Sequence, residues 1–186
     1  MKKSTRIIIA TLVALVVITI ATPFVFFKRG DGNYSKFSEA VHVSLAGSNA
    51  VLEHEPVAEL GIKVDGIYAD SISSLQVCIV ENPDTASKLV VEADKALMRY
   101  ISLQPRKDGS CRLFVGIEGD ENPVDVSAPS LNITIHVPAG SLHYVDPFWN
   151  VDVTLQDFNN ATMTFRDNRN LRLVNSSFAT FSLTNI

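Results

Sequence analysis

Residues suited to catalysis are sparse and widely spaced along the chain. Asp157 and Asp167 lie ten residues apart, at places where corners between strands are expected. Carboxylates gathered on one face of a β-fold can cleave acidic polysaccharides, but Asp is also common in turns because it tolerates left-handed backbone. The sequence has no nucleophile-elbow, zinc-protease, phosphate-loop or dinucleotide motif. We therefore expect no catalytic residue, no cofactor and no enzymatic activity.

Metal-binding and redox motifs are also missing from the sequence. The four histidines are scattered through strand-like segments: His42, His54, His136 and His143. Zinc needs several ligands brought together, and no Cys-x-x-Cys or Cys/His cluster has that spacing, so we predict no metal site. Cys78 and Cys111 could form one disulfide outside the cytoplasm, worth about 3–4 kcal/mol. The equal alternative is that both are small buried apolar residues.

One turn could present a binding surface, the segment Asp146-Pro147-Phe148-Trp149-Asn150. Aromatic side chains on a turn can stack against sugar rings or anchor a partner protein. Phe148 and Trp149 are therefore the candidate binding residues. The alternative is that they cover the end of the hydrophobic core.

Charge is unevenly distributed along the 186 residues. Five of the 16 Lys and Arg residues lie in the first 29 positions, where none of the 20 Asp and Glu residues lies. Residues 30–186 thus carry 11 basic and 20 acidic residues, a formal net charge of −9. Binding to nucleic acid needs clustered Lys and Arg, so this part of the chain is not expected to bind it.

An uncharged run at residues 7–27 predicts a membrane-spanning segment. A helix of this length spans roughly 30 Å, the thickness of a bilayer core. A cleavable signal peptide is the alternative, but its apolar stretch is usually shorter. Basic residues before the run favour a cytoplasmic N-terminus. We predict a cytoplasmic segment 1–6, a transmembrane signal anchor 7–27, a linker 28–37 and an extracytoplasmic β domain 38–186, in the periplasm or at the cell surface.

The remaining sequence alternates apolar and polar residues over short stretches, which predicts an all-β domain. From Leu131 onward the alternating sets recur about every ten residues. They are Leu131/Ile133/Ile135, Leu142/Tyr144, Val151/Val153/Leu155, Ala161/Met163/Phe165, Leu171/Leu173 and Phe181/Leu183. This interval is typical of stacked coils, so we expect a β-helix-like domain, with a β-sandwich as the alternative. No Asn-Gly or Asp-Gly pair stands between the strands from Leu131 onward, which favours coils over hairpins there.

Three stretches carry a resemblance to a known family: FSEAVHVSLAGSNAVLE at 37–53, LVVEADKALMRYISLQPRKDGSCRLFVGIEG at 89–119 and LNITIHVPAGSLHYV at 131–145. They resemble the adhesin-head (GIN-domain) family of Bacteroidetes envelope proteins. The family's glycine-rich turn after the Pro-containing strand is replaced here by residues 146–150. The resemblance implies a right-handed β-helix-like fold on the extracytoplasmic side, and it supplies no catalytic residue.

These observations predict a non-catalytic, membrane-anchored envelope protein that presents its β domain for adhesion or scaffolding. Its expected partners are the membrane, through residues 7–27, and envelope proteins or glycans. One alternative is an extracytoplasmic sensor acting through another membrane protein, and a second is a carbohydrate-active enzyme. An exposed strand edge at the C-terminal end would also favour self-association.

Overall fold

The structure is a computed structural model that describes residues 40–69, 75–82, 87–117, 123–148, 151–159, 161–166 and 170–184. Residues 41–186 form one compact unit. The predicted anchor at 7–27 and the linker at 28–37 lie outside the described residues. Within the described ranges, no helix is long and apolar enough to cross a membrane.

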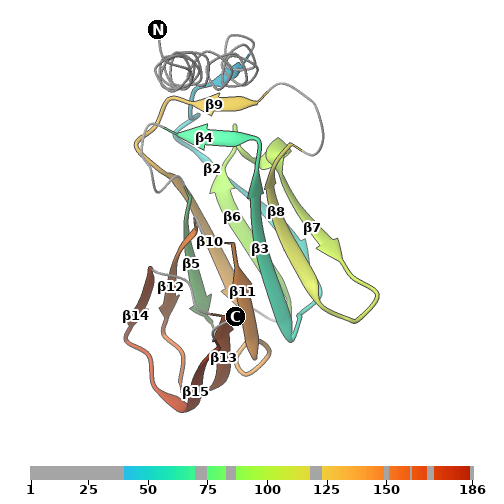
Figure 1. The fold of residues 1–186 in the computed structure, drawn as a ribbon, viewed down its shortest axis with the longest axis vertical. Coiled ribbons are helices and arrows are strands. Elements are labelled where there is room, and N and C mark those ends of the chain that lie inside the picture. Colours follow the sequence, from blue (N-terminus) through green and yellow to red (C-terminus); the bar gives the residue numbers. More distant parts are fainter. Residues whose placement is uncertain are drawn as a thin grey trace, which may run out of the picture. The chain divides into compact units, whose positions relative to one another are not determined.

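The described elements are β-strands, apart from one short 3-10 helix, η1 (Met98–Tyr100). The strands form three sheets, which we name A, B and C (Figure 1). Sheet A contains, in spatial order, β1 (Val41–Val43), β9 (Val124–Val126) and β4 (Ile67–Ala69). Sheet B contains β14 (Leu171–Val174), β12 (Val151–Gln156), β5 (Leu75–Glu81), β10 (Leu131–Val137), β6 (Leu89–Asp94) and β2 (Asn49–His54). Sheet C contains β15 (Phe178–Thr184), β13 (Ala161–Arg166), β11 (Tyr144–Pro147), β3 (Glu59–Asp65), β8 (Cys111–Gly116) and β7 (Ile101–Pro105).

Most neighbouring strands pair in parallel, as coils stacked on one another require. Sheet A is parallel throughout, as are β14-β12-β5-β10 in sheet B and β15-β13-β11-β3-β8 in sheet C. Antiparallel pairing joins only β2 to β6, β6 to β10 and β7 to β8 within the described sheets. The all-β prediction is therefore confirmed, and parallel stacking replaces the hairpin pairing of an antiparallel sandwich. The right-handed sense of the coils stays a prediction.

The stacking order of the coils differs from their order in the sequence. One coil follows β3, β4 and β5 through sheets C, A and B, and the next follows β8, β9 and β10. The earlier coil nevertheless lies in the middle, because β5 sits between β10 and β12 and β3 sits between β8 and β11. The intervening strands β6 and β7 pair antiparallel with β10 and β8, so they interrupt a simple ten-residue stack.

The hydrophobic core lies between the sheets and is built from the alternating residues that the sequence suggested. Register aligns them in continuous rows, for example Ile135, Ile79 and Leu155, each fully buried. Removing these apolar side chains from water is the main driving force for stacking the coils. Tyr144 departs from the prediction, because it faces outward while Val145 is buried. Leu142 lies in the turn before β11, so the alternation restarts there.

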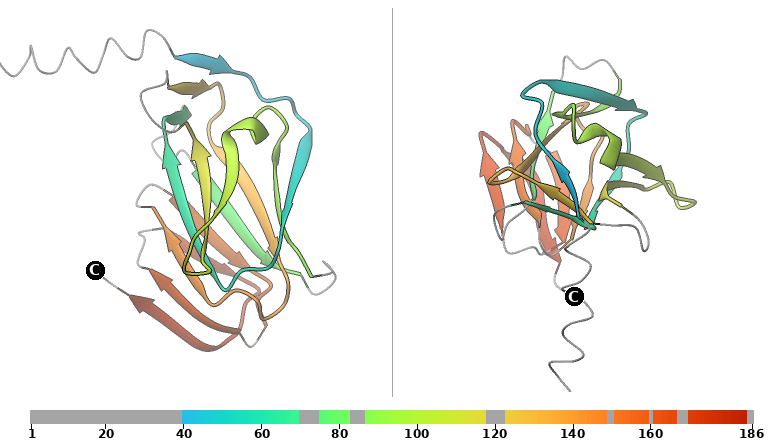
Figure 2. Two further views of the ribbon diagram at one scale, coloured as in Figure 1. Left: turned by 90° about the vertical axis from the view of Figure 1, so that its right-hand side faces the viewer. Right: turned by 90° about the horizontal axis from the view of Figure 1, so that it is seen from above.

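Segment 94–103, which the sequence leaves open between helix and strand, contains both kinds of structure. The 3-10 turn η1 is followed directly by β7, and Leu97 and Ile101 are buried. Together with β2, β6 and β7, this turn covers one end of the core (Figure 2). The opposite end consists of β14 and β15, where Leu173 is 47% exposed and Leu183 is 61% exposed.

Glu81 connects the corners of three neighbouring coils. Its side chain is buried, with Oε1 accepting the N–H of Gly140 at 2.8 Å and Oε2 accepting the N–H of Asn159 at 2.9 Å. These two corners follow β10 and β12, the strands on either side of β5. A buried carboxylate is tolerated when such donors satisfy it, so Glu81 is a structural residue.

Candidate functional site

The outward face of sheet B presents rows of polar side chains. Parallel register places Asn132 of β10, Gln76 of β5 and Asp152 of β12 next to one another. The following row contains Thr134, Cys78, Thr154 and Arg172. Such rows form because side chains at alternate positions of every strand point to the same face, about 4.8 Å from their neighbours on the adjacent strand.

A hollow of about 460 Å³ lies on this face, and we call it the sheet B hollow. It is lined by Gln76, Val77, Cys78, Asn132, Ile133, Thr134, Asp152, Val153, Thr154, Asn170, Leu171 and Arg172. Its polar side chains are amides, hydroxyls, one thiol, one carboxylate and one guanidinium. The described lining thus carries one formal charge of each sign and many neutral hydrogen-bonding groups.

Hydrogen bonds organise part of the sheet B hollow. The Nδ2 group of Asn170 donates to Oδ1 of Asp152, which joins the row on β12 to the residue preceding β14. The Cys78 thiol lies 3.7 Å from Oε1 of Gln156. Partial burial, with a smaller contribution from the nearby Asp157 carboxylate, raises the pKa of the Cys78 thiol. This thiol therefore remains protonated at neutral pH and is a weak nucleophile.

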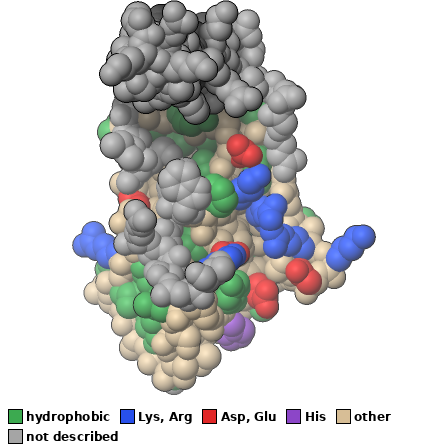
Figure 3. Space-filling model, in the orientation of Figure 1, with side chains coloured by type: hydrophobic (Ala, Val, Ile, Leu, Met, Phe, Trp, Pro, Cys, Tyr) green, Lys and Arg blue, Asp and Glu red, His purple; other side chains and the backbone are tan. Residues whose placement is uncertain are grey.

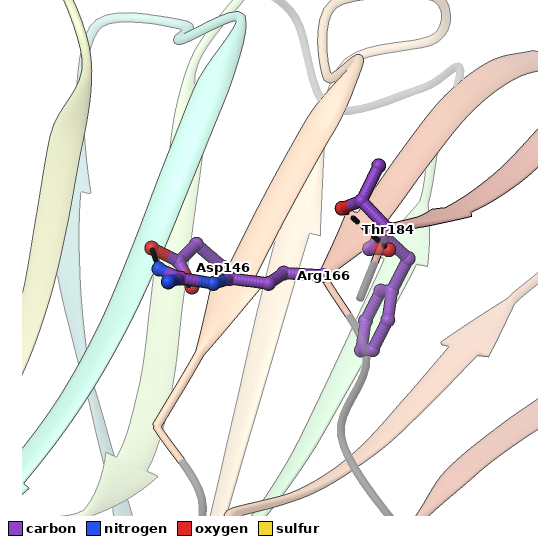
Figure 4. A network of polar contacts seen from close by, with 4 residues as sticks. Asp146, Arg166 and Thr184 are labelled. Carbon is purple, nitrogen blue, oxygen red and sulfur yellow. Dashed lines mark hydrogen bonds and ion pairs between the residues drawn. The ribbon is translucent and has the colours of Figure 1, made fainter. Parts of the chain in front are cut away.

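The outward face of sheet C has a different chemical character. Lys and Arg side chains gather over β3 and β8 in Figure 3. Nη1 of Arg166 on β13 lies 3.0 Å and 2.9 Å from the two carboxylate oxygens of Asp146 on β11 (Figure 4). Lys63 lies 3.1 Å from Asp65 and 5.6 Å from the ring centre of Phe114. These charged groups are engaged with one another, whereas most polar side chains described in the sheet B hollow are neutral amides and hydroxyls.

The predicted aromatic binding residues lie at the corner between β11 and β12. Phe148 is 39% exposed, and its N–H donates to the carbonyl of Ile62 at 2.8 Å. Its ring is thus at the surface while its backbone extends sheet C. Trp149 lies outside the described residues. Phe148 is not among the described residues that line the sheet B hollow.

Cys78 and Cys111 are free in this structure. Cys78 points outward from β5 in sheet B, whereas Cys111 at the start of β8 in sheet C is buried in the core. The two side chains therefore lie on different sheets, Cys78 on an outer face and Cys111 in the core. Burial is also the main reason why the pKa of the Cys111 thiol is raised. The interpretation of Cys111 as a small buried residue agrees with the structure.

Of the two carboxylates first considered for catalysis, Asp157 and Asp167, the structure describes Asp157. Asp157 adopts the left-handed conformation, with φ of 60°, and its Oδ2 accepts a hydrogen bond from Gln156 at 2.9 Å. The turn-forming interpretation of Asp157 is thereby confirmed, while Asp167 lies outside the described residues. Over the described ranges, no group of three His, Cys, Asp or Glu side chains could hold a metal ion.

Sequence reasoning missed the sheet B hollow because its residues come from four separate strands. Gln76, Asn132 and Asp152 each occupy an ordinary outward position, and none belongs to a motif. The available signal was the ten-residue period. It gives Asp152 and Arg172 the same place in their repeats, whereas in the structure Arg172 is in register with Thr154. Placing Gln76 beside both Asn132 and Asp152 required the unexpected position of β5 between β10 and β12.

Comparisons with known proteins give matches among solved structures. No family model matches the chain, and no curated protein does so either. A "putative adhesin" from Parabacteroides merdae is 14% identical, with a TM-score of 0.35, over 73% of this chain and 56% of that one. Two proteins from Parabacteroides distasonis also match. The "putative lipid binding protein" is 12% identical, with a TM-score of 0.32, over 71% of this chain and 62% of that one. The "putative adhesin" is 15% identical, with a TM-score of 0.32, over 77% of this chain and 59% of that one.

The chain spans less than two thirds of the length of each of these three structures. The matches include Bacteroidetes structures described as "putative adhesin", at low sequence identity. At this identity the likeness concerns the fold alone.

Proposed function

We propose that this chain is a non-catalytic, membrane-anchored envelope protein of the adhesin-head (GIN-domain) type. Residues 7–27 anchor it, and the β domain binds a neutral, hydroxyl-rich glycan in the sheet B hollow. Binding of this kind serves adhesion to a surface or attachment of an envelope component. The proposal joins the sequence resemblance and the uncharged N-terminal run to the chemistry of one face of the domain.

The observation that carries the proposal is the composition of the sheet B hollow. Amide side chains such as Gln76 and Asn132 offer donors and acceptors together, as do the hydroxyls of Thr134 and Thr154. Sugar hydroxyls also donate and accept, so they match such a surface group by group. Asp152 and Arg172, the charged residues of the described lining, balance in charge, which favours an uncharged ligand over a phosphate or a polyanion.

The same composition supports binding rather than glycoside cleavage. Most glycosidases use two carboxyl groups, about 5–10 Å apart, that flank the bond to be broken. Among the described residues, the lining of the sheet B hollow supplies one carboxylate, Asp152, and it accepts a hydrogen bond from Asn170. A ligand placed over these rows would therefore be held without the acid–base pair that hydrolysis requires.

A glycan array probed with the full chain in detergent tests the glycan-binding proposal. We expect binding to neutral glycans that is lost, or weakened at least tenfold, in Thr154→Ala and Asn132→Ala variants. Thr162→Ala is the matched control, because Thr162 faces outward on β13 of the other sheet and its substitution should leave binding unchanged. Equal weakening by Thr154→Ala and Thr162→Ala, or no glycan bound at all, would contradict the proposal.

Membrane anchoring is tested separately, by fractionation of cells that express the full chain. The anchor predicts that the protein stays in the membrane pellet after washing with high salt and alkaline carbonate. Removal of residues 7–27 should release the β domain. Extraction of the full chain by carbonate would show that residues 7–27 do not span the bilayer, and it would leave the glycan test unaffected.

A further inference from the structure

Two sheet edges lie together at one end of the coil stack. Among the described strands, β14 pairs only with β12 and β15 pairs only with β13. Their inward-facing residues continue the core rows, since Leu173 is in register with Leu155 and Leu183 with Phe165. These two leucines are nevertheless 47% and 61% exposed. Among the described strands, the coil of β14 and β15 therefore presents backbone without a partner strand and apolar side chains on the same surface, which we call the open end.

The open end has few of the features that usually protect a sheet edge: Arg172 on β14 and one register shift near the start of β15, where Ala161 pairs with Phe178 and Thr162 with Thr180. Natural edge strands are blocked by charged residues, proline or bulges that prevent another strand from adding. Residues 170–184 contain no Asp, Glu, Lys or Pro, and Arg172 is their single charged residue. The edge strands at the covered end differ, because β2 contains Glu53 and β7 ends at Pro105.

The occupant of the open end must satisfy two edges at once. Facing sheets lie about 10 Å apart, so one added strand would pair with β14 or with β15 and leave the other edge and the leucines exposed. A second copy of this chain offers two edges at the same separation, with apolar side chains between them. Charge favours the same partner, because residues 170–184 carry no carboxylate in a domain of net charge −9. Two copies approach with the least repulsion at this end.

We propose that two copies of this chain associate through their open ends. A two-fold axis perpendicular to the sheets sets β14 against β14 of the other copy and β15 against its counterpart. This axis reverses the strand direction, so both new pairs are antiparallel, the arrangement with the straighter hydrogen bonds. Leu173 and Leu183 of each copy then fill one shared core. The contact is isologous and closes at a dimer, so it does not grow into a fibre.

Sedimentation equilibrium of the full chain in density-matched detergent tests this dimer. We expect dimers whose dissociation constant rises at least a hundredfold in Leu173→Lys and Leu183→Lys variants, because each copy would place a charge in the shared core. Val51→Lys is the matched control. Val51 is also 61% exposed, but it lies on β2 at the covered end, so this variant should dimerise like the native chain.

Circular dichroism of each variant, recorded in the same detergent, establishes that the strands remain folded. Folded Leu173→Lys and Leu183→Lys monomers beside a dimeric Val51→Lys variant would support the proposal. A native chain that is monomeric at all concentrations would overturn it. So would dimers that persist in both leucine variants, since association would then involve another surface such as the anchor. Open-ended oligomers would also overturn it, because they indicate a head-to-tail contact.

Discussion

Two carboxylates each fix backbone groups that belong to distant parts of the chain. Glu81 of β5 accepts N–H groups from the corners after β10 and β12. Asp94 at the end of β6 accepts the N–H groups of Ala46 and Gly47 at 2.9 Å and that of Ala96 at 2.8 Å. These bonds define loops that have little apolar surface of their own. Such side chains therefore matter more to the fold than their polar character suggests.

Replacing Glu81 with Ala should destabilise the domain by about 2–4 kcal/mol, because two partly buried N–H groups lose their acceptor. Urea unfolding followed by circular dichroism measures this loss. Glu53→Ala is the control, since Glu53 is an exposed residue that pairs with Lys88 at the surface. We expect the control to unfold close to the native midpoint. Equal losses in the two variants would show that the Glu81 bonds contribute little.

The hydrogen bonds accepted by the Asp94 carboxylate predict that the folded domain loses stability in acid. The hydrogen bond from the N–H of Ala46 is the largest cause that lowers the pKa of this carboxyl below its ordinary value of 3.8. A lowered pKa in the folded state stabilises the fold above the ordinary value, and this stabilisation is lost as pH falls through the folded-state pKa. Melting temperatures measured from pH 6 to pH 2.5 should therefore fall more gently below pH 4 in Asp94→Asn than in the native chain. Superimposable profiles would contradict this role.

Stacking of the elements depends on corners as much as on the strands themselves. Strands of successive coils pair in register, so every corner must return the chain to the same level of the neighbouring sheet. Asp157 and Asn175 do so in the left-handed conformation, with φ of 60° and 48°. Gly116 ends β8 with φ of 134°, a region that other residues rarely enter.

Gly116→Ala should prevent folding or greatly reduce the yield of soluble protein. Gly116 is in register with Asp65, and an added Cβ would collide with the carbonyl oxygen of Asp65. Gly109→Ala is the matched control: Gly109 also has a positive φ, of 85°, but nothing lies within 4 Å of the added Cβ. We expect the control to lose only about 1–2 kcal/mol. Thermal melts of the two purified variants compare them, and equal stability would refute the collision.

At the scale of the whole domain, two facing sheets give each residue either a core-facing or an outward position. That division places Cys78 in the sheet B hollow and Cys111 in the core. It also sets the sheet B hollow apart from the outer face of sheet C, since charged side chains pair on sheet C while mostly neutral amides and hydroxyls line the described part of the hollow. The two ends of the stack differ in the same way, one covered and the other open.

Stability should not depend on the redox state of the solution, because both thiols are free. Melting temperatures with and without a reductant are expected to coincide. Alkylation of the native protein should modify Cys78 slowly, since the pKa of its thiol is raised, and Cys111 only after unfolding. A melting temperature that falls when the reductant is added would show that a disulfide forms between the two cysteines.

Local sequence was sufficient for predictions that depend on one strand or one corner. Alternation identified the inward faces of β10, β12, β13, β14 and β15, because side chains on a strand alternate whatever the strand pairs with. The left-handed corner at Asp157 likewise depends on a single residue type. The prediction that Tyr144 faces inward was wrong, because the turn at Leu142 shifts the phase of the alternation. Strand periodicity does not encode such a shift.

Sequence by itself determined the all-β class, the strand faces and the acidic balance of residues 30–186, since these depend on residue type and short-range spacing. Only the tertiary structure decided that β5 lies between β10 and β12. That placement assembles the sheet B hollow, separates the two cysteines and brings Glu81 to two corners. The physical reason is that strand order depends on pairing between distant segments. Such pairing is decided by the combined burial of many side chains and is not encoded in any single segment.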